Sequence, residues 1–217
     1  MRPTEKRLAL DVFPVTTGLL ALLVAVFVVE AIEGGATDVL TLLRLGANHP
    51  PLVLGGQWYR LVTAMLLHIG VVHLLMHGWA LWILGRLSEV TFGSHATLAL
   101  FVFTGVCGST FTLLGDGISA GASGALFGIE GALVAFFLRH RERLTPSGRA
   151  LLAQLGVWTA ILLVYTFLVP GIDWRGHLGG LASGVAIGWL LKPCQGQPPG
   201  VFARAAAGIA ALAIVAS

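Results

Sequence analysis

The sequence has few charged residues. Lys and Arg together number 13 and Asp and Glu number 10, which is 11% of the 217 residues. Soluble domains carry about a quarter charged residues, so this chain lacks the polar surface that keeps a domain dissolved. The hydrophobic fraction is 56% and the mean hydropathy is +0.88. These values exclude an ordinary water-soluble domain and predict a membrane protein.

Cysteines and polar linkers are also scarce. There are two cysteines, Cys107 in a predicted helix and Cys194 at a predicted helix end, and such a pair does not form a disulfide framework. No soluble domain, low-complexity linker or clear internal repeat interrupts the apolar blocks. The net charge of +3 and the pI of about 9.3 follow from where Lys and Arg fall around the membrane, so no nucleic-acid partner is needed.

The apolar residues come in long blocks, each close to the roughly 20 residues that a membrane-spanning helix needs. Six segments qualify: 16–32, 68–87, 96–114, 121–138, 150–169 and 174–191. A seventh stretch, 201–217, is slightly short and is a candidate for a further helix. The fold class predicted is an all-α polytopic membrane protein with a six-helix bundle.

Three regions follow from this pattern. We expect a short cytoplasmic N-terminus at 1–15, a transmembrane core at 16–192 and a tail at 193–217. The core includes a long connection at 33–65, whose apolar runs predict that it lies in the membrane interface.

The basic residues predict the orientation, because Lys and Arg concentrate on the cytoplasmic side. A six-helix topology places ten of them on the side of the N-terminus and three on the other. The N-terminus is therefore expected in the cytoplasm of a cell-membrane protein. The second, fourth and sixth helices would then begin toward the outer side.

Polar residues stand at these three helix starts, and ionisable residues at membrane depth are functional candidates. His68, His73 and His77 belong to the second predicted helix, Ser123 to the fourth and His177 to the sixth. A serine becomes nucleophilic when a nearby base takes its proton. Ser123 lies near a helix N-terminus, where free N–H groups also suit an oxyanion. This grouping favours acyl-transfer chemistry.

Small residues would bring two of these helices together. Glycines recur every four residues in the sixth helix, at Gly176, Gly180, Gly184 and Gly188. The fourth helix offers Gly121, Gly124, Gly128 and Gly131. Small residues at this spacing allow close helix packing in lipid, which would place His177 beside Ser123. A serine among glycines is also common in helix packing, so the residues alone leave catalysis and plain packing open.

The ordered set of motifs resembles the rhomboid family from about residue 45 to 190. The matching segments are Leu45-Gly46-Ala47-Asn48, Trp58-Tyr59-Arg60, His68-Ile69-Gly70-Val71-Val72-His73, Gly121-Ala122-Ser123-Gly124 and His177-Leu178-Gly179-Gly180. The resemblance implies an intramembrane serine protease without a cofactor. Its substrates would be single-pass transmembrane proteins in the lipid bilayer.

The resemblance also implies roles for residues. Ser123 would be the nucleophile and His177 the base of a dyad without a third acidic member, and His73 would bind the oxyanion. Structural roles near the site are expected for His68, Gly121, Gly124 and Gly180.

Two positions depart from the pattern of the family. His77 stands where the family has an asparagine that helps to bind the oxyanion, and we expect His77 to replace it as a donor. Glu130 lies two turns below Ser123, and we expect a structural role for it inside the bundle.

Two other functions stay open. His73 and His77 are spaced i, i+4, as zinc ligands on one helix face are, so the cluster could serve a metal-dependent membrane hydrolase or a metal-handling protein. The chain has no HExxH motif and no acidic residue within the cluster. A non-catalytic rhomboid-like protein that binds transmembrane segments is the other alternative, although such relatives usually lack the serine or the histidine. No metal site is predicted.

Overall fold

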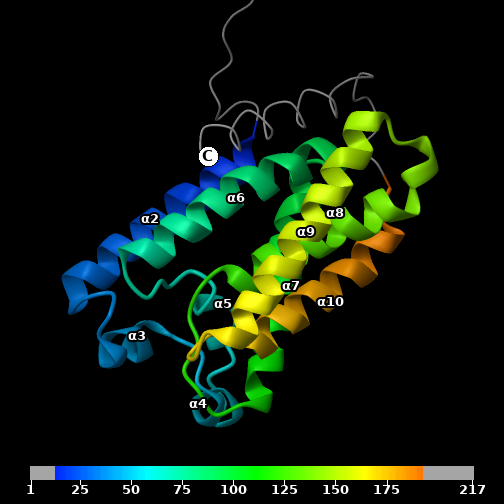
Figure 1. Cartoon of the computed structure of the whole chain (residues 1–217). Coiled ribbons are helices and arrows are strands. Elements are labelled where there is room, and N and C mark those ends of the chain that lie inside the picture. The colour runs from blue at the N-terminus through cyan, green and yellow to red at the C-terminus, as the bar shows by residue number, and fades with distance from the viewer. Residues whose placement is uncertain (1–12, 193–217) are drawn as a thin grey trace, which may run out of the picture.

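The computed structural model describes residues 13–192, and this part of the chain is helical, with no strand. Its six long helices are α2 (Pro14–Glu33), α6 (Val71–Phe92), α7 (Ser94–Phe111), α8 (Ser123–Arg139), α9 (Pro146–Leu168) and α10 (Trp174–Leu190). They lie at the six predicted spans and confirm the predicted all-α bundle (Figure 1). The candidate seventh helix at 201–217 and Cys194 lie outside the described residues.

The helices differ in how they meet a membrane. By length and composition alone, three segments could cross a membrane: α2, α9 and Ser94–Leu114. The last of these consists of α7 and the short 3-10 helix η1 (Thr112–Leu114). Helices α8 and α10 have 17 residues each, fewer than the roughly 20 of a full span. Helix α8 packs against α6, α7, α9 and α10 and is buried over most of its length. It is therefore the central helix of the bundle.

Helices α8 and α10 pack backbone against backbone. A Cβ atom built on Gly180 would lie 2.0 Å from the carbonyl oxygen of Gly124, and one built on Gly184 would lie 1.9 Å from that of Gly128. No real Cβ comes so close to an oxygen, so only glycine fits at either position. The predicted close packing of these helices is confirmed. Gly121 is an exception, because it precedes α8 and faces other residues.

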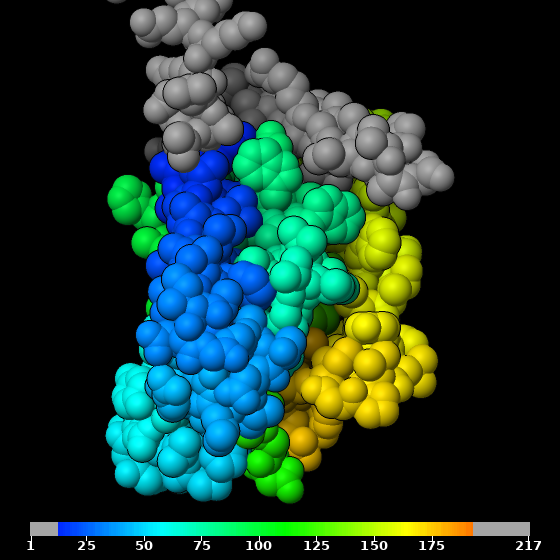
Figure 2. All heavy atoms as spheres, turned by 90° about the vertical axis from the view of Figure 1, so that its left-hand side faces the viewer, coloured from blue at the N-terminus to red at the C-terminus, as the bar shows by residue number. Residues whose placement is uncertain are grey.

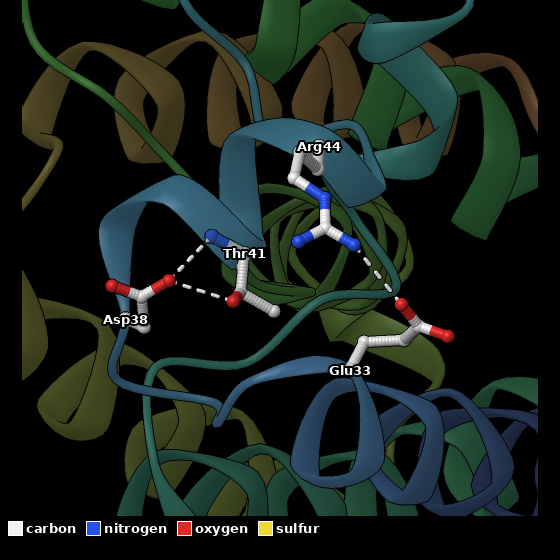
Figure 3. Close-up of polar contacts among 4 residues, drawn as sticks. All are labelled: Glu33, Asp38, Thr41 and Arg44. Atoms are coloured by element: carbon white, nitrogen blue, oxygen red, sulfur yellow. Dashed lines mark hydrogen bonds and ion pairs between the residues drawn. The ribbon is translucent and has the colours of Figure 1, made fainter.

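The chain between α2 and α6 forms three short helices, α3 (Val39–Leu45), α4 (Pro50–Leu54) and α5 (Arg60–Thr63). They lie together at the lower end of the bundle in Figure 1. Asp38 caps α3 by accepting hydrogen bonds from the amide and hydroxyl of Thr41, and Arg44 pairs with Glu33 at the end of α2, at 3.1 Å (Figure 3). The bonds from Thr41 hold the pKa of Asp38 below its ordinary value. The expected placement of this segment in the membrane interface stays a prediction.

Buried polar residues fix the ends of the bundle. The guanidinium of Arg60 donates to the carbonyl oxygens of Leu43 and Ala47, at 2.7 and 2.9 Å, and so closes the α3–α5 segment. At the opposite end, Glu89 of α6 accepts hydrogen bonds from the amide and hydroxyl of Thr16, at 2.7 and 2.6 Å. Such satisfied polar contacts hold helix ends in place without exposing unpaired groups to lipid.

The start of α6 corrects one prediction. This helix begins at Val71 rather than at residue 68, because Gly70 has a φ of +83°, which a right-handed helix does not allow. His68 therefore lies in the connection before α6, and only His73 and His77 are on the helix. Its end, at Phe92, is five residues later than predicted. The predicted orientation in the membrane stays a prediction.

Candidate active site

Ser123 and His177 line the same cavity. Ser123 is the first residue of α8, and His177 lies in the first turn of α10. The cavity has a volume of about 20 Å³, which is room for about one water molecule. Among residues 13–192, no hydrogen bond joins the two side chains. In serine hydrolases without substrate, the distance between the two catalytic groups is often longer than a hydrogen bond. The glycine packing of α8 and α10 brings the predicted pair to one place.

The backbone before Ser123 turns sharply to place the serine. Gly121 has a φ of +132°, and its amide donates to the carbonyl oxygen of Ala64 at 2.8 Å. Helix α8 then starts directly, so the first amide groups of the helix have no partner within it. Figure 1 shows the green segment before α8 rising from the lower end of the bundle before the helix begins. Ser123 therefore stands at a helix N-terminus inside the protein.

Two residues hold the ring of His177. Phe127, one turn after Ser123, stacks on the imidazole with the ring centroids 4.6 Å apart and the planes 29° apart. On α9, the hydroxyl of Thr166 makes a hydrogen bond of 2.5 Å with His177 Nδ1. Sequence reasoning missed both residues. The i, i+4 spacing of Phe127 from Ser123 could have revealed one of them, whereas a threonine in an apolar helix gives no signal.

Asp173 ties together three segments around the cavity. Its carboxylate accepts from the amide of Gly176 at 3.0 Å, and so caps α10. It also accepts from the hydroxyls of Ser119, at 2.9 Å, and Thr112. The cavity is lined in part by all four residues. Asp173 was not among the residues predicted for the site, although an aspartate just before a helix is a known N-cap signal.

The histidines His73 and His77 cover Gly121. Their ring centroids are 4.0 Å apart, and a Cβ atom on Gly121 would lie 2.8 Å from Cε1 of His73 and 2.9 Å from Cε1 of His77. Nδ1 of His73 accepts the amide of Ile69 at 3.1 Å, so the proton of the neutral ring is on Nε2. Nδ1 of His77 is buried and has no hydrogen-bond partner in the described part of the chain.

His68 belongs to the scaffold around this pair. Its amide donates to the carboxylate of Glu30 at 3.0 Å, and its Nδ1 bonds with the carbonyl oxygen of Leu66 at 3.1 Å. The ring packs against those of His73 and His77, with centroids 5.4 and 5.1 Å apart. These contacts favour the structural role that we expect for His68.

Two further sequence predictions concern the surroundings of the site. Within residues 13–192, no group of three His, Cys, Asp or Glu side chains is placed to hold a metal ion, so the geometry gives the metal hypothesis no support. Glu130 is 2% exposed, interacts with Thr159 of α9 and is not among the residues that line the cavity. Its surroundings favour a structural role.

Residues 55–194 match the rhomboid domain, which covers more than half of the chain and every residue of this site. The chain belongs to the rhomboid family. The resemblance that the motifs indicated is thereby confirmed, and the chain is a multi-pass membrane protein.

Three relatives show the range of similarity within the rhomboid family. The rhomboid protease GluP of Bacillus subtilis is 37% identical over 185 residues, which are 84% of this chain and 36% of that protein. The mitochondrial RHOMBOID-like protein 6 of Arabidopsis thaliana is 35% identical over 70% of this chain and 50% of its own length. The putative rhomboid protease YdcA of Bacillus subtilis is 27% identical over 82% of this chain and 88% of its length. This chain therefore spans about half or less of the first two relatives.

Proposed function

We propose that this rhomboid protein is a serine endopeptidase that cleaves membrane proteins within the bilayer, with Ser123 as nucleophile and His177 as base. The observation that carries the proposal is the cavity that these two residues share at the starts of α8 and α10. Two of its relatives are named as rhomboid proteases, which supports the same activity. Relatives that only bind transmembrane segments usually lack the serine or the histidine, whereas this chain has both Ser123 and His177, which favours the protease.

The reaction follows the general course of serine hydrolases. Nε2 of His177 takes the hydroxyl proton of Ser123 while Oγ bonds to the scissile carbonyl carbon, whose π electrons move onto the oxygen. As this intermediate collapses, the C–N bond breaks and the imidazolium gives its proton to the leaving amine. Water then attacks the ester in the same manner, which releases the new carboxyl end and restores the serine.

The negative oxygen of the intermediate needs hydrogen-bond donors. The free amide of Ser123 at the start of α8 is one candidate. Nε2 of His73 is another, because Nδ1 of this ring is already an acceptor and because Nε2 would lie 3.1 Å from a Cβ on Gly121. Both candidates lie beside the Gly121 turn, next to the nucleophile.

His77 is the third proposed donor, and its role can be tested by substitution. We expect His77→Asn to keep most of the activity, because an amide restores the donor typical of the family. His77→Ala and His77→Phe should lower kcat tenfold or more, because the loss of one oxyanion donor typically costs about 10²–10³ in turnover. The measurement is the steady-state cleavage of a transmembrane reporter in liposomes.

A matched outcome separates this role from simple filling of space. If His77→Phe, which fills the volume without a donor, cleaves as fast as the unmodified protein, His77 is not a donor. The oxyanion would then depend on His73 and the backbone amide.

The substrates proposed are single-pass transmembrane proteins. Exposed apolar side chains cover the outside of α2, α6 and α9, as lipid contact requires. Figure 2 shows that the surface is hollowed between the teal atoms of α6 and the yellow atoms of α9. We propose this hollow as the side from which a substrate segment reaches Ser123, on the outer side of the membrane.

Chelation separates the serine mechanism from the metal hypothesis. In liposomes, cleavage of a single-pass reporter should continue at an unchanged rate in excess chelator, because no step of the dyad uses a metal. Purified protein should also contain no stoichiometric zinc. A one-to-one zinc content that is lost together with activity would instead establish the metal hydrolase and overturn the proposal.

A further inference from the structure

Thr166 occupies an unusual position at the end of α9. The second half of this helix is exposed on nearly all sides, with Tyr165 and Phe167 on its surface, and Thr166 is its only buried residue. The exposed fraction of Thr166 is 3%. Its one hydrogen bond among the described residues goes to Nδ1 of His177, at 2.5 Å. The end of α9 therefore meets α10 at the proposed catalytic base.

The hydroxyl of Thr166 behaves differently from those of most other threonines in these helices. A threonine in a helix commonly donates its hydroxyl to the carbonyl four residues earlier. In this chain Thr17, Thr91, Thr97, Thr104, Thr110 and Thr159 all do so. Thr166 forms no such bond and turns its hydroxyl to the ring of His177 instead. The side chain thus gives up its usual local partner for a contact with the base.

We propose that Thr166 is a positioning residue for His177, resting on the serine mechanism proposed above. Its hydroxyl oxygen accepts the Nδ1–H of the imidazole, which leaves the lone pair on Nε2 free to take the proton of Ser123. In serine hydrolases with a triad, a third residue fixes the tautomer and orientation of the histidine in this way. Here a neutral hydroxyl on α9 supplies that contact, so Thr166 takes the place of the third residue of a triad without carrying a charge.

Phe127 and Thr166 restrain the imidazole ring of His177 in different ways. Stacking on Phe127 fixes the plane of the imidazole but not which edge faces Ser123. The bond from Nδ1 to Thr166 fixes that rotation, and it remains in place when the ring becomes an imidazolium. Removal of the hydroxyl should therefore slow the chemical step without weakening the binding of substrate.

The test compares Thr166→Val, which keeps the branched shape, with Thr166→Ser, which keeps the hydroxyl. Thr110→Val is the control, since the hydroxyl of Thr110 on α7 bonds to the carbonyl oxygen of Val106 and Thr110 does not line the cavity. Each variant is measured in liposomes for kcat and KM with a transmembrane reporter. The rate of labelling by a small fluorophosphonate is also measured, because this probe needs the dyad but no passage of a substrate helix.

Thr166→Val should lower both kcat and the labelling rate about tenfold, which corresponds to the loss of one neutral hydrogen bond in the transition state. KM should stay within about twofold, and Thr166→Ser and Thr110→Val should stay close to the unmodified protein. If valine prevents folding, Thr166→Ala against Thr166→Ser gives the same comparison of a side chain without and with the hydroxyl.

Three results would overturn the inference. Thr166→Val could label and cleave at the normal rate, Thr166→Ser could be as slow as the valine variant, or the valine variant could cleave faster while labelling is unchanged. The last would mean that Thr166 only closes α9 against the bundle. A parallel Ser123→Ala sample keeps the two proposals apart, because continued activity there would refute the serine mechanism itself.

Discussion

Ser123→Ala and His177→Ala should each abolish cleavage of a transmembrane reporter while the protein stays folded. The serine oxygen and the imidazole take part in every bond that forms or breaks, and loss of one member of such a unit lowers the rate roughly 10⁴–10⁶-fold. Both side chains are only half-buried, so we expect alanine to leave the packing of α8 and α10 intact. The measurements are kcat in liposomes and thermal unfolding in detergent.

A matched control for this experiment is Ser183→Ala. Ser183 lies on α10, and its hydroxyl bonds to the carbonyl oxygen of Gly180 on the same helix. It is not among the residues that line the cavity. This variant should cleave at nearly the normal rate. Activity of Ser123→Ala within tenfold of the unmodified protein would contradict the assignment of the nucleophile.

Gly184→Ala should have the largest effect on stability. The added Cβ would lie 1.9 Å from the carbonyl oxygen of Gly128 and 2.6 Å from its carbonyl carbon, so the backbones of α8 and α10 must separate. Overpacking of this kind typically lowers the free energy of unfolding by about 1–3 kcal/mol. Because backbone meets backbone at Gly184, we expect a loss of about 3 kcal/mol or more here. The melting temperature should fall by ~6–12 °C. Activity should fall as well, because this contact sets the separation of Ser123 and His177.

Gly156→Ala provides the comparison for this result. Gly156 lies in the middle of α9, and a Cβ there has no atom within 4 Å. Alanine in an open helical position is favoured over glycine by about 0.5–1 kcal/mol, so the melting temperature should stay the same or rise slightly. Equal destabilisation by both substitutions would show that α8 and α10 are not held by this close contact.

The sequence predicts the frame of this protein well because two signals are local. Long apolar blocks mark the six helices, and the four-residue spacing of Gly180 and Gly184 marks the helix pair that packs most closely. The combination of Ser123 with His177 at matching helix starts then indicates the site. These inferences need only the period of a helix and the cost of polar groups in lipid.

The features that escaped prediction depend on tertiary contacts or on single backbone angles. The start of α6 is set by the positive φ of Gly70, which moves His68 out of the helix. Thr166 looks like any threonine in an apolar helix until α9 is placed against α10. Asp173 shows a capping signal, but its partners Ser119 and Thr112 lie 54 and 61 residues away in the chain. A local capping signal does not predict these two bonds.

Mapping the adduct of a fluorophosphonate tests the central claim most directly. The probe phosphonylates a serine that a nearby base activates, and the labelled protein in liposomes is digested and sequenced by mass spectrometry. We predict one adduct on Ser123, with labelling lost in Ser123→Ala and strongly slowed in His177→Ala. Labelling of another residue, or equal labelling of Ser123→Ala, would contradict the proposal that Ser123 is the nucleophile of this rhomboid protein.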